Sequence, residues 1–115
     1  MNMKKRVLIV EDNPVIADAV AELVEESLDC DTLMVPTVEE AMALLDAQVD
    51  LGILDVEVAD GLTYPLAVRM MQHQIPFLFM SGSDPKKVPS ELASAPFLRK
   101  PVPPDTLLTA AQRCL

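Results

Sequence analysis

Short apolar runs alternate with segments of helical periodicity along the whole chain. Runs with the length and composition of buried strands occupy residues 7–10, 32–35, 51–54, 76–80 and 97–98. The segments between the first four runs, and a last segment after Pro104, place apolar residues at helical spacing. Because strands and helices alternate, the pattern predicts an α/β protein with a parallel sheet and helices on both of its faces.

Local signals mark where these helices begin. Asn13 can cap a helix whose first position is Pro14. The stretch 37–40, Thr-Val-Glu-Glu, is a capping box, and it opens a helix that should carry Ala41, Leu44 and Leu45 on its inner side. These capping signals place the starts of the first two helices where the hydrophobic pattern also predicts them.

The stretch from Asp84 to Pro96 breaks the helical pattern. A helix capped by Asp84 could start at Pro85, but Pro89 would then lie in its interior. An interior proline loses a backbone hydrogen bond and clashes with the preceding turn, which costs about 3 kcal/mol. We therefore predict one or two short turns here in place of a regular helix.

Length, charge and cysteine content narrow the class of protein. The 115 residues fit one domain, taken as residues 1–115. No apolar run approaches the roughly 20 residues that span a bilayer, so no membrane segment is expected. A net charge of −9 repels phosphate backbones, so nucleic acid is not an expected partner. Cys30 and Cys114 show no metal-ligand or disulfide spacing, which favours two reduced thiols in a cytoplasmic protein.

Polar residues with chemical potential follow four of the predicted strands: Glu11 and Asp12, Asp55, Ser81, and Lys100. The carboxyl ends of parallel strands meet at one edge of the sheet, where ligands bind in open α/β folds. Three carboxylates that meet there repel one another and must either raise their pKa values or bind a cation, and oxygen ligands suit Mg²⁺. A carboxylate nucleophile, a magnesium ion, a lysine and a hydroxyl together make a site for phosphoryl transfer.

The motifs VLIVEDNP, ILDVEVADG, FMSGS and FLRKPV, in this order, resemble those of response-regulator receiver domains over nearly the whole chain. The resemblance implies a flavodoxin-like, doubly wound five-stranded parallel sheet with strand order 2-1-3-4-5. It also implies that Asp55 accepts a phosphoryl group. In the Asp84–Pro96 stretch the chain resembles an atypical receiver subgroup with a short fourth helix.

The same resemblance implies a magnesium site around the phosphoacceptor. Asp12 would touch the metal directly and Glu11 would act through water. Asp55 itself and the backbone carbonyl of Glu57 would complete the protein's ligands. The Glu57 side chain borders the site, and the sequence leaves open whether it adds a ligand or slows hydrolysis of the phosphate.

A switch is implied as well. Ser81 matches the family's switch hydroxyl, Lys100 the lysine that pairs with the phosphate, and Phe97 the switch aromatic. Capture of the phosphate by Ser81 would let Phe97 rotate inward and change a protein-binding surface.

We expect a signalling domain of a two-component phosphorelay, active as a monomer or weak dimer and not an enzyme beyond its own phosphorylation and dephosphorylation. Its partners would be a sensor histidine kinase or phosphotransfer protein and a downstream target protein. The chain ends directly after the last predicted helix, which suggests a stand-alone receiver, and a fragment of a longer regulator would look the same. Two alternatives stay open: a pseudo-receiver that only binds partners, and a Mg²⁺-dependent phosphatase with an aspartyl intermediate, because residues 55–58 faintly resemble the haloacid-dehalogenase nucleophile motif.

Overall fold

The centre of the protein is a parallel β-sheet of five strands. A computed structural model describes residues 4–82 and 88–115, and within them the strand order is β2-β1-β3-β6-β7. These strands are β1 (Lys5–Val10), β2 (Cys30–Val35), β3 (Leu51–Asp55), β6 (Phe77–Ser81) and β7 (Phe97–Arg99). The helices are α1 (Pro14–Leu28), α2 (Val38–Ala43), α3 (Tyr64–Gln72) and α4 (Pro104–Cys114). Counted along the five sheet strands alone, the order is 2-1-3-4-5, so the predicted flavodoxin-like fold is confirmed.

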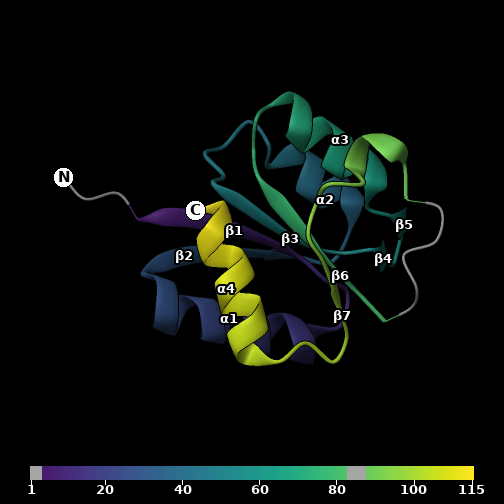
Figure 1. The fold of residues 1–115 in the computed structure, drawn as a ribbon. Helices are drawn as coiled ribbons and strands as arrows, with labels where there is room; N and C mark the ends of the chain where they lie inside the picture. Colours follow the sequence, from purple (N-terminus) through teal and green to yellow (C-terminus); the bar gives the residue numbers. More distant parts are fainter. Residues whose placement is uncertain (1–3, 83–87) are drawn as a thin grey trace.

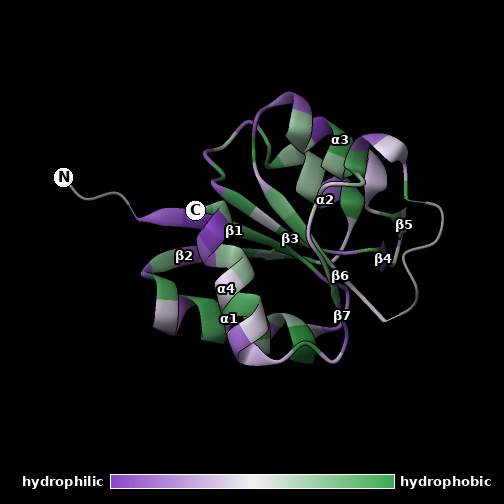
Figure 2. Cartoon of the chain, in the orientation of Figure 1, coloured by the Kyte–Doolittle hydropathy of each residue, from purple (hydrophilic) through white to green (hydrophobic). Residues whose placement is uncertain are grey.

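Helices cover both faces of the sheet, with α1 and α4 on one side and α2 and α3 on the other (Figure 1). Alternate residues of one strand therefore enter different cores. Val7 and Ile9 pack with α1 and α4, whereas Leu8 and Val10 pack toward α2 and α3. Because both faces are covered, β1 carries an uninterrupted buried apolar run at residues 7–10, without polar alternation, whereas its exposed start at Lys5 and Arg6 is polar (Figure 2).

The two predicted helix caps are present. The Asn13 side-chain oxygen accepts hydrogen bonds from the backbone N–H groups of Val15 and Ile16, at 3.0 and 3.3 Å. The Thr37 hydroxyl accepts one from the N–H of Glu40, at 3.1 Å. Helix α2 is shorter than predicted, because it ends at Ala43 and Leu44 is its C-cap. Leu45 is still buried, but it lies in the turn that follows.

The proline-rich stretch forms no long helix in its described part. Residues 83–87, which include Asp84 and Pro85, lie outside the described residues. From residue 88 onward, the stretch up to β7 contains a single 3₁₀ turn, η1 (Ser90–Leu92), with Pro89 at its N-cap. Leu92 is buried and anchors this turn in the core on the α2–α3 side. The prediction of short turns is confirmed for residues 88–96.

A small hairpin follows β3. Strands β4 (Glu57–Val58) and β5 (Gly61–Leu62) pair antiparallel. Gly61 has a φ of 130°, a conformation that residues with a side chain rarely adopt. The Asp60 carboxylate accepts hydrogen bonds from the backbone N–H groups of Val38 and Glu39, at 2.8 and 3.1 Å, and so caps α2 from outside.

Among the described residues, no helix has the length and apolar character needed to cross a membrane.

Candidate functional site

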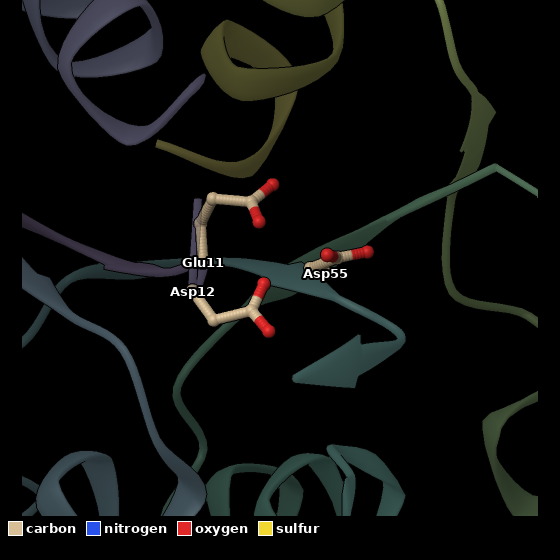
Figure 3. Close-up of side chains that lie close together, drawn as sticks. All are labelled: Glu11, Asp12 and Asp55. Carbon is tan, nitrogen blue, oxygen red and sulfur yellow. The ribbon is translucent and has the colours of Figure 1, made fainter. Parts of the chain in front are cut away.

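Three carboxylates meet at the carboxyl edge of the sheet. Glu11 and Asp12 directly follow β1, and Asp55 is the last residue of the neighbouring strand β3. One oxygen from each lies within 4.8 Å of the others, and the side chains project beyond the strand ends (Figure 3). Glu11 and Asp55 are buried, with 4% and 9% of their surface exposed, while Asp12 is exposed. The arrangement agrees with the sequence-based prediction for these three residues.

Lys100 supplies the positive charge of the site. Its Nζ lies 2.9 Å from Glu11 Oε1 and 3.2 Å from Asp55 Oδ2, so one ammonium group pairs with both buried carboxylates. Its backbone N–H donates to the Ser81 carbonyl at 2.8 Å, which ties the residue to the end of β6. Of these two contacts, the one with Glu11 is the shorter.

The crowding of charge perturbs the protonation of the site. Burial and the neighbouring Glu11 carboxylate raise the pKa of Asp55 to about 6, although Lys100 opposes them. Burial would also raise the pKa of Glu11, but hydrogen bonds from Lys100 and from the Asn13 N–H together hold it below its ordinary value. Burial alone would lower the pKa of Lys100, and its two carboxylate partners outweigh that effect and raise it. The negative charge of the pair therefore rests more firmly on Glu11 than on Asp55.

The donor set fits magnesium. Carboxylate oxygens are the ligands that this hard cation prefers, and it usually keeps several of its waters. The exposed Asp12 lies on the open side of the group, which leaves the site accessible to a hydrated ion. The Glu57 carboxylate is not a member of this group in the described part of the chain, and its side chain is exposed on β4. The metal-binding role of the Glu57 backbone carbonyl remains a prediction.

Mg²⁺ should raise the melting temperature of the protein, because a ligand that binds only the folded state stabilises it by about 2.7 kcal/mol at a hundredfold excess over its dissociation constant. Asp12→Ala should lose most of this shift. Asp18→Ala is the matched control, since Asp18 is an exposed carboxylate on α1 outside the group of three. Thermal melts with and without Mg²⁺ measure the effect, and an equal shift in the Asp12 and Asp18 variants would place the cation elsewhere.

The predicted switch residues lie on the two strands beyond β3, toward the α2–α3 side of the sheet. Ser81 is buried at the end of β6, and alternation along the strand puts its side chain on the same face as Phe79. The Phe97 ring stacks on Phe79, with centroids 4.7 Å apart and planes inclined by 30°. Ser81, Phe79 and Phe97 thus face the same side of the sheet on two adjacent strands.

One residue of the site was not anticipated. Thr63 is fully buried, and its hydroxyl donates a hydrogen bond of 2.7 Å to the backbone carbonyl of Asp55. A threonine before Tyr64-Pro65 looks like an ordinary helix cap, so the sequence carried no signal for this contact.

Comparison with known proteins agrees with this geometry. The family model described as response regulator receiver domain matches residues 7–112. SdrG from Sphingomonas melonis Fr1, a solution structure, is 33% identical, with 99% of this chain and 98% of that one covered and a TM-score of 0.81. The non-phosphorylated HemR receiver domain from Leptospira biflexa is 26% identical, with 96% and 94% covered and a TM-score of 0.82. A CheY-like receiver domain protein from Methanospirillum hungatei JF-1 shares the fold at 22% identity, with 96% and 93% covered and a TM-score of 0.84. No curated protein sequence matched the chain.

The chain belongs to the response regulator receiver domain family. Membership implies a phosphoacceptor role in two-component signalling, with histidine kinases or phosphotransfer proteins and downstream targets as partners. Receiver domains generally bind Mg²⁺ in an acidic pocket, and the group of Glu11, Asp12 and Asp55 is compatible with one.

Proposed function

We propose that this domain takes a phosphoryl group from a phosphohistidine partner onto Asp55, with Mg²⁺ bound, and passes the signal on by changing a protein-binding surface. The observation that carries the proposal is the position of Asp55. It is a buried carboxylate at the end of a central strand, it shares one group with Glu11 and Asp12, and it lies 3.2 Å from the Lys100 ammonium. A cytoplasmic location is part of the proposal.

In the transfer step, an Asp55 carboxylate oxygen forms a bond to phosphorus as the phosphorus–nitrogen bond of the phosphohistidine breaks. The leaving imidazole takes up a proton, and the product is an acyl phosphate on Asp55. Above a pH of about 6 the Asp55 carboxylate is ionised and therefore able to attack. In-line attack requires little more of the protein than position and charge stabilisation.

The other side chains hold and neutralise the group. When bound by Glu11, Asp12 and Asp55, Mg²⁺ would neutralise charge that develops on the phosphoryl oxygens. Lys100 already lies within ion-pair distance of Asp55, so it needs only a small displacement to pair with a phosphoryl oxygen instead. Its second contact, with Glu11, keeps the ammonium at the site during that exchange.

The conformational change that alters the protein-binding surface would pass through Ser81 and Phe97. A phosphoryl oxygen on Asp55 offers a new acceptor to the Ser81 hydroxyl at the end of the adjacent strand. Movement of Ser81 toward it would change the surroundings of Phe79 and so the packing of Phe97, which is half-buried at the sheet's edge. Phosphorylation then acts as a population shift, through contacts that differ between the two states.

Intact-mass analysis after incubation with acetyl phosphate tests the proposal directly. With Mg²⁺, the protein should gain the mass of one phosphoryl group, and fragmentation should place it on the peptide that contains Asp55. Without Mg²⁺, in the presence of a chelator, uptake should fall to background. A protein that folds and binds Mg²⁺ but never gains the mass is a pseudo-receiver. Steady turnover of small phosphoesters would instead indicate a phosphatase, contrary to the non-enzymatic role proposed here.

A surface for the phosphodonor protein adjoins the site. An apolar groove of about 670 Å³ runs between α1 and α4, and Lys100 lines its end beside the carboxylates. Val15, in the first turn of α1, lies at this groove and has 76% of its surface exposed. Large apolar side chains exposed next to a reaction centre are typical of a docking surface for another protein.

Val15→Lys should therefore slow phosphotransfer from a partner protein at least tenfold, because docking would desolvate a charge at the centre of the contact. Labelling by acetyl phosphate should be unchanged, since the small donor needs no docking surface. Met71→Lys is the matched control, because Met71 is 40% exposed on α3, on the opposite face of the sheet. Equal transfer rates for the two variants would exclude this surface.

A further inference from the structure

Thr63 occupies the junction between the β4–β5 hairpin and helix α3, and it is fully buried. Its hydroxyl donates to the Asp55 carbonyl at 2.7 Å and lies 3.3 Å from the Val56 carbonyl. Its backbone N–H donates to the Val56 carbonyl at 2.9 Å, and its own carbonyl accepts from the Ala67 N–H at 3.0 Å. The residue thus joins the end of the phosphoacceptor strand to the start of a helix.

The hydroxyl contact falls on the peptide group that directly follows Asp55. This peptide group consists of the Asp55 carbonyl and the Val56 N–H. The N–H donates to the Met80 carbonyl of β6 at 3.0 Å, and the carbonyl accepts from Thr63. Hydrogen bonds at both ends fix the plane of this peptide and, with it, the direction of the Asp55 side chain.

The hydrogen bond from Thr63 to the Asp55 carbonyl lies just beyond the point where β3 stops pairing with β1. The pairing of β1 with β3 ends at Val10 and Leu54, one residue before Asp55. Thr63 therefore supplies a donor at the point where the ladder stops. The following residues lead into the hairpin that carries the Glu57 carbonyl, so the same contact also sets where this carbonyl lies.

The Thr63 hydroxyl donates to the Asp55 carbonyl and does not cap helix α3, which would be its more common role at this position. Thr63 is the N-cap residue of α3, and a threonine there ordinarily accepts a hydrogen bond from the first turn of its helix. Within the described residues, the Thr63 side chain makes no such cap bond. A purely structural helix cap would face the helix, whereas this hydroxyl faces the phosphoacceptor.

We propose that Thr63 is a positioning residue for phosphoryl transfer, which through its hydroxyl orients Asp55 and the backbone that leads to the Glu57 carbonyl, the predicted metal ligand. The inference rests on the proposed function of Asp55. Thr63 touches neither donor nor metal and acts through the Asp55–Val56 peptide. Loss of a group that orients a reacting or metal-binding residue typically lowers activity or metal affinity by roughly 10–100-fold.

The test compares Thr63→Val, which keeps the shape but removes the hydroxyl, with Thr63→Ser, which keeps the hydroxyl. Val24→Ala is the control for lost stability, because Val24 is fully buried on α1 and contacts the opposite core. Phosphorylation rates are measured by intact mass at saturating acetyl phosphate and Mg²⁺, at a temperature where circular dichroism shows all four proteins folded. Mg²⁺ dissociation constants are measured separately by calorimetry.

Thr63→Val should label roughly 10–100-fold more slowly than the wild type and bind Mg²⁺ more weakly. Thr63→Ser should stay within about threefold of the wild-type rate, and Val24→Ala should match the wild type. A wild-type rate in Thr63→Val, or an equal loss in Val24→Ala, would overturn the positioning role. If the wild type itself takes up no phosphoryl group, the proposed function fails. The positioning role is then judged on the metal alone, and unchanged Mg²⁺ affinity in Thr63→Val overturns it.

Discussion

Replacement of Asp55 by asparagine should abolish phosphoryl uptake and, without divalent cations, make the folded protein more stable at neutral pH. The first effect follows because an amide oxygen is no nucleophile toward phosphorus, while the shape of the site is kept. The second effect follows from the raised pKa of Asp55, about 6 instead of 3.8, which burial and the Glu11 carboxylate cause. An ionised Asp55 therefore destabilises the folded protein, and asparagine removes that charge.

The stability difference between Asp55→Asn and the wild type should depend on pH. The folded protein holds the Asp55 proton more tightly than the unfolded chain does, so this group lowers the free energy of unfolding as pH rises from about 4 to about 6. Above that window the full penalty is present. Two pKa units correspond to about 3 kcal/mol, a value that already includes the attraction to Lys100 and that we treat as an upper bound. We expect Asp55→Asn to gain about 1–2 kcal/mol at neutral pH and almost nothing near pH 4.

Urea unfolding at both pH values measures the gain, and intact mass measures the loss of labelling. Asp60→Asn is a matched control, because Asp60 is also an aspartate in the β3–α3 connection but caps α2 with its charge. Its pKa is lowered by the hydrogen bond from Val38, so its substitution should destabilise the fold at neutral pH. Labelling of Asp55→Asn at the wild-type rate, or a lower stability than wild type at neutral pH, would contradict our description of the site.

Phe79→Ala should be among the most destabilising single substitutions in this chain. Phe79 is fully buried, and its ring contacts three other aromatic rings, with centroid distances of 5.6, 5.5 and 4.7 Å to Tyr64, Phe77 and Phe97. Removal of a buried phenyl ring costs about 3–5 kcal/mol, because the cavity that it leaves collapses only in part. Domains of this kind have a total stability of roughly 5–15 kcal/mol, so the variant should be close to unfolding at physiological temperature.

Phe77→Ala is the comparison for this prediction. Phe77 lies on the same face of β6 but is only half-buried, so its removal should cost clearly less. The two variants are compared by their urea midpoints at equal m-values, which ensures that the compactness of the unfolded state has not changed. Should Phe77→Ala lose as much stability as Phe79→Ala, the aromatic cluster would not be centred on Phe79 as described.

The sheet and the acidic group were predictable because they depend on features that are local in sequence. Strands buried on both faces must be apolar throughout, and the run from Val7 to Val10 shows this directly. Residues that follow parallel strands must meet at one edge, so the strand pattern alone predicts that Glu11, Asp12 and Asp55 lie together, as they do in the structure. The break at Pro89 was equally local, since it follows from the geometry of proline itself.

The parts that escaped prediction depend on contacts between distant residues. Helix α2 stops at Ala43 although Leu44 and Leu45 continue its apolar pattern, and no sequence signal marks that end. The β4–β5 pairing involves two-residue strands, which are too short to show any periodicity. The choice of Thr63 to serve the Asp55 carbonyl, and the closer approach of Lys100 to Glu11 than to Asp55, depend on how the folded chain packs.

The hydrogen bonds from the first turn of α2 to the Asp60 carboxylate connect the hairpin to this helix. The turn of the hairpin after Asp55 accepts hydrogen bonds from two backbone N–H groups of that helix. The hairpin therefore connects the phosphoacceptor strand to the first turn of α2. A displacement at the strand end should therefore be transmitted to the outer surface rather than be absorbed by a slack loop. A binding protein selected against the first turn of α2 should distinguish the two states of Asp55 without touching the acidic group.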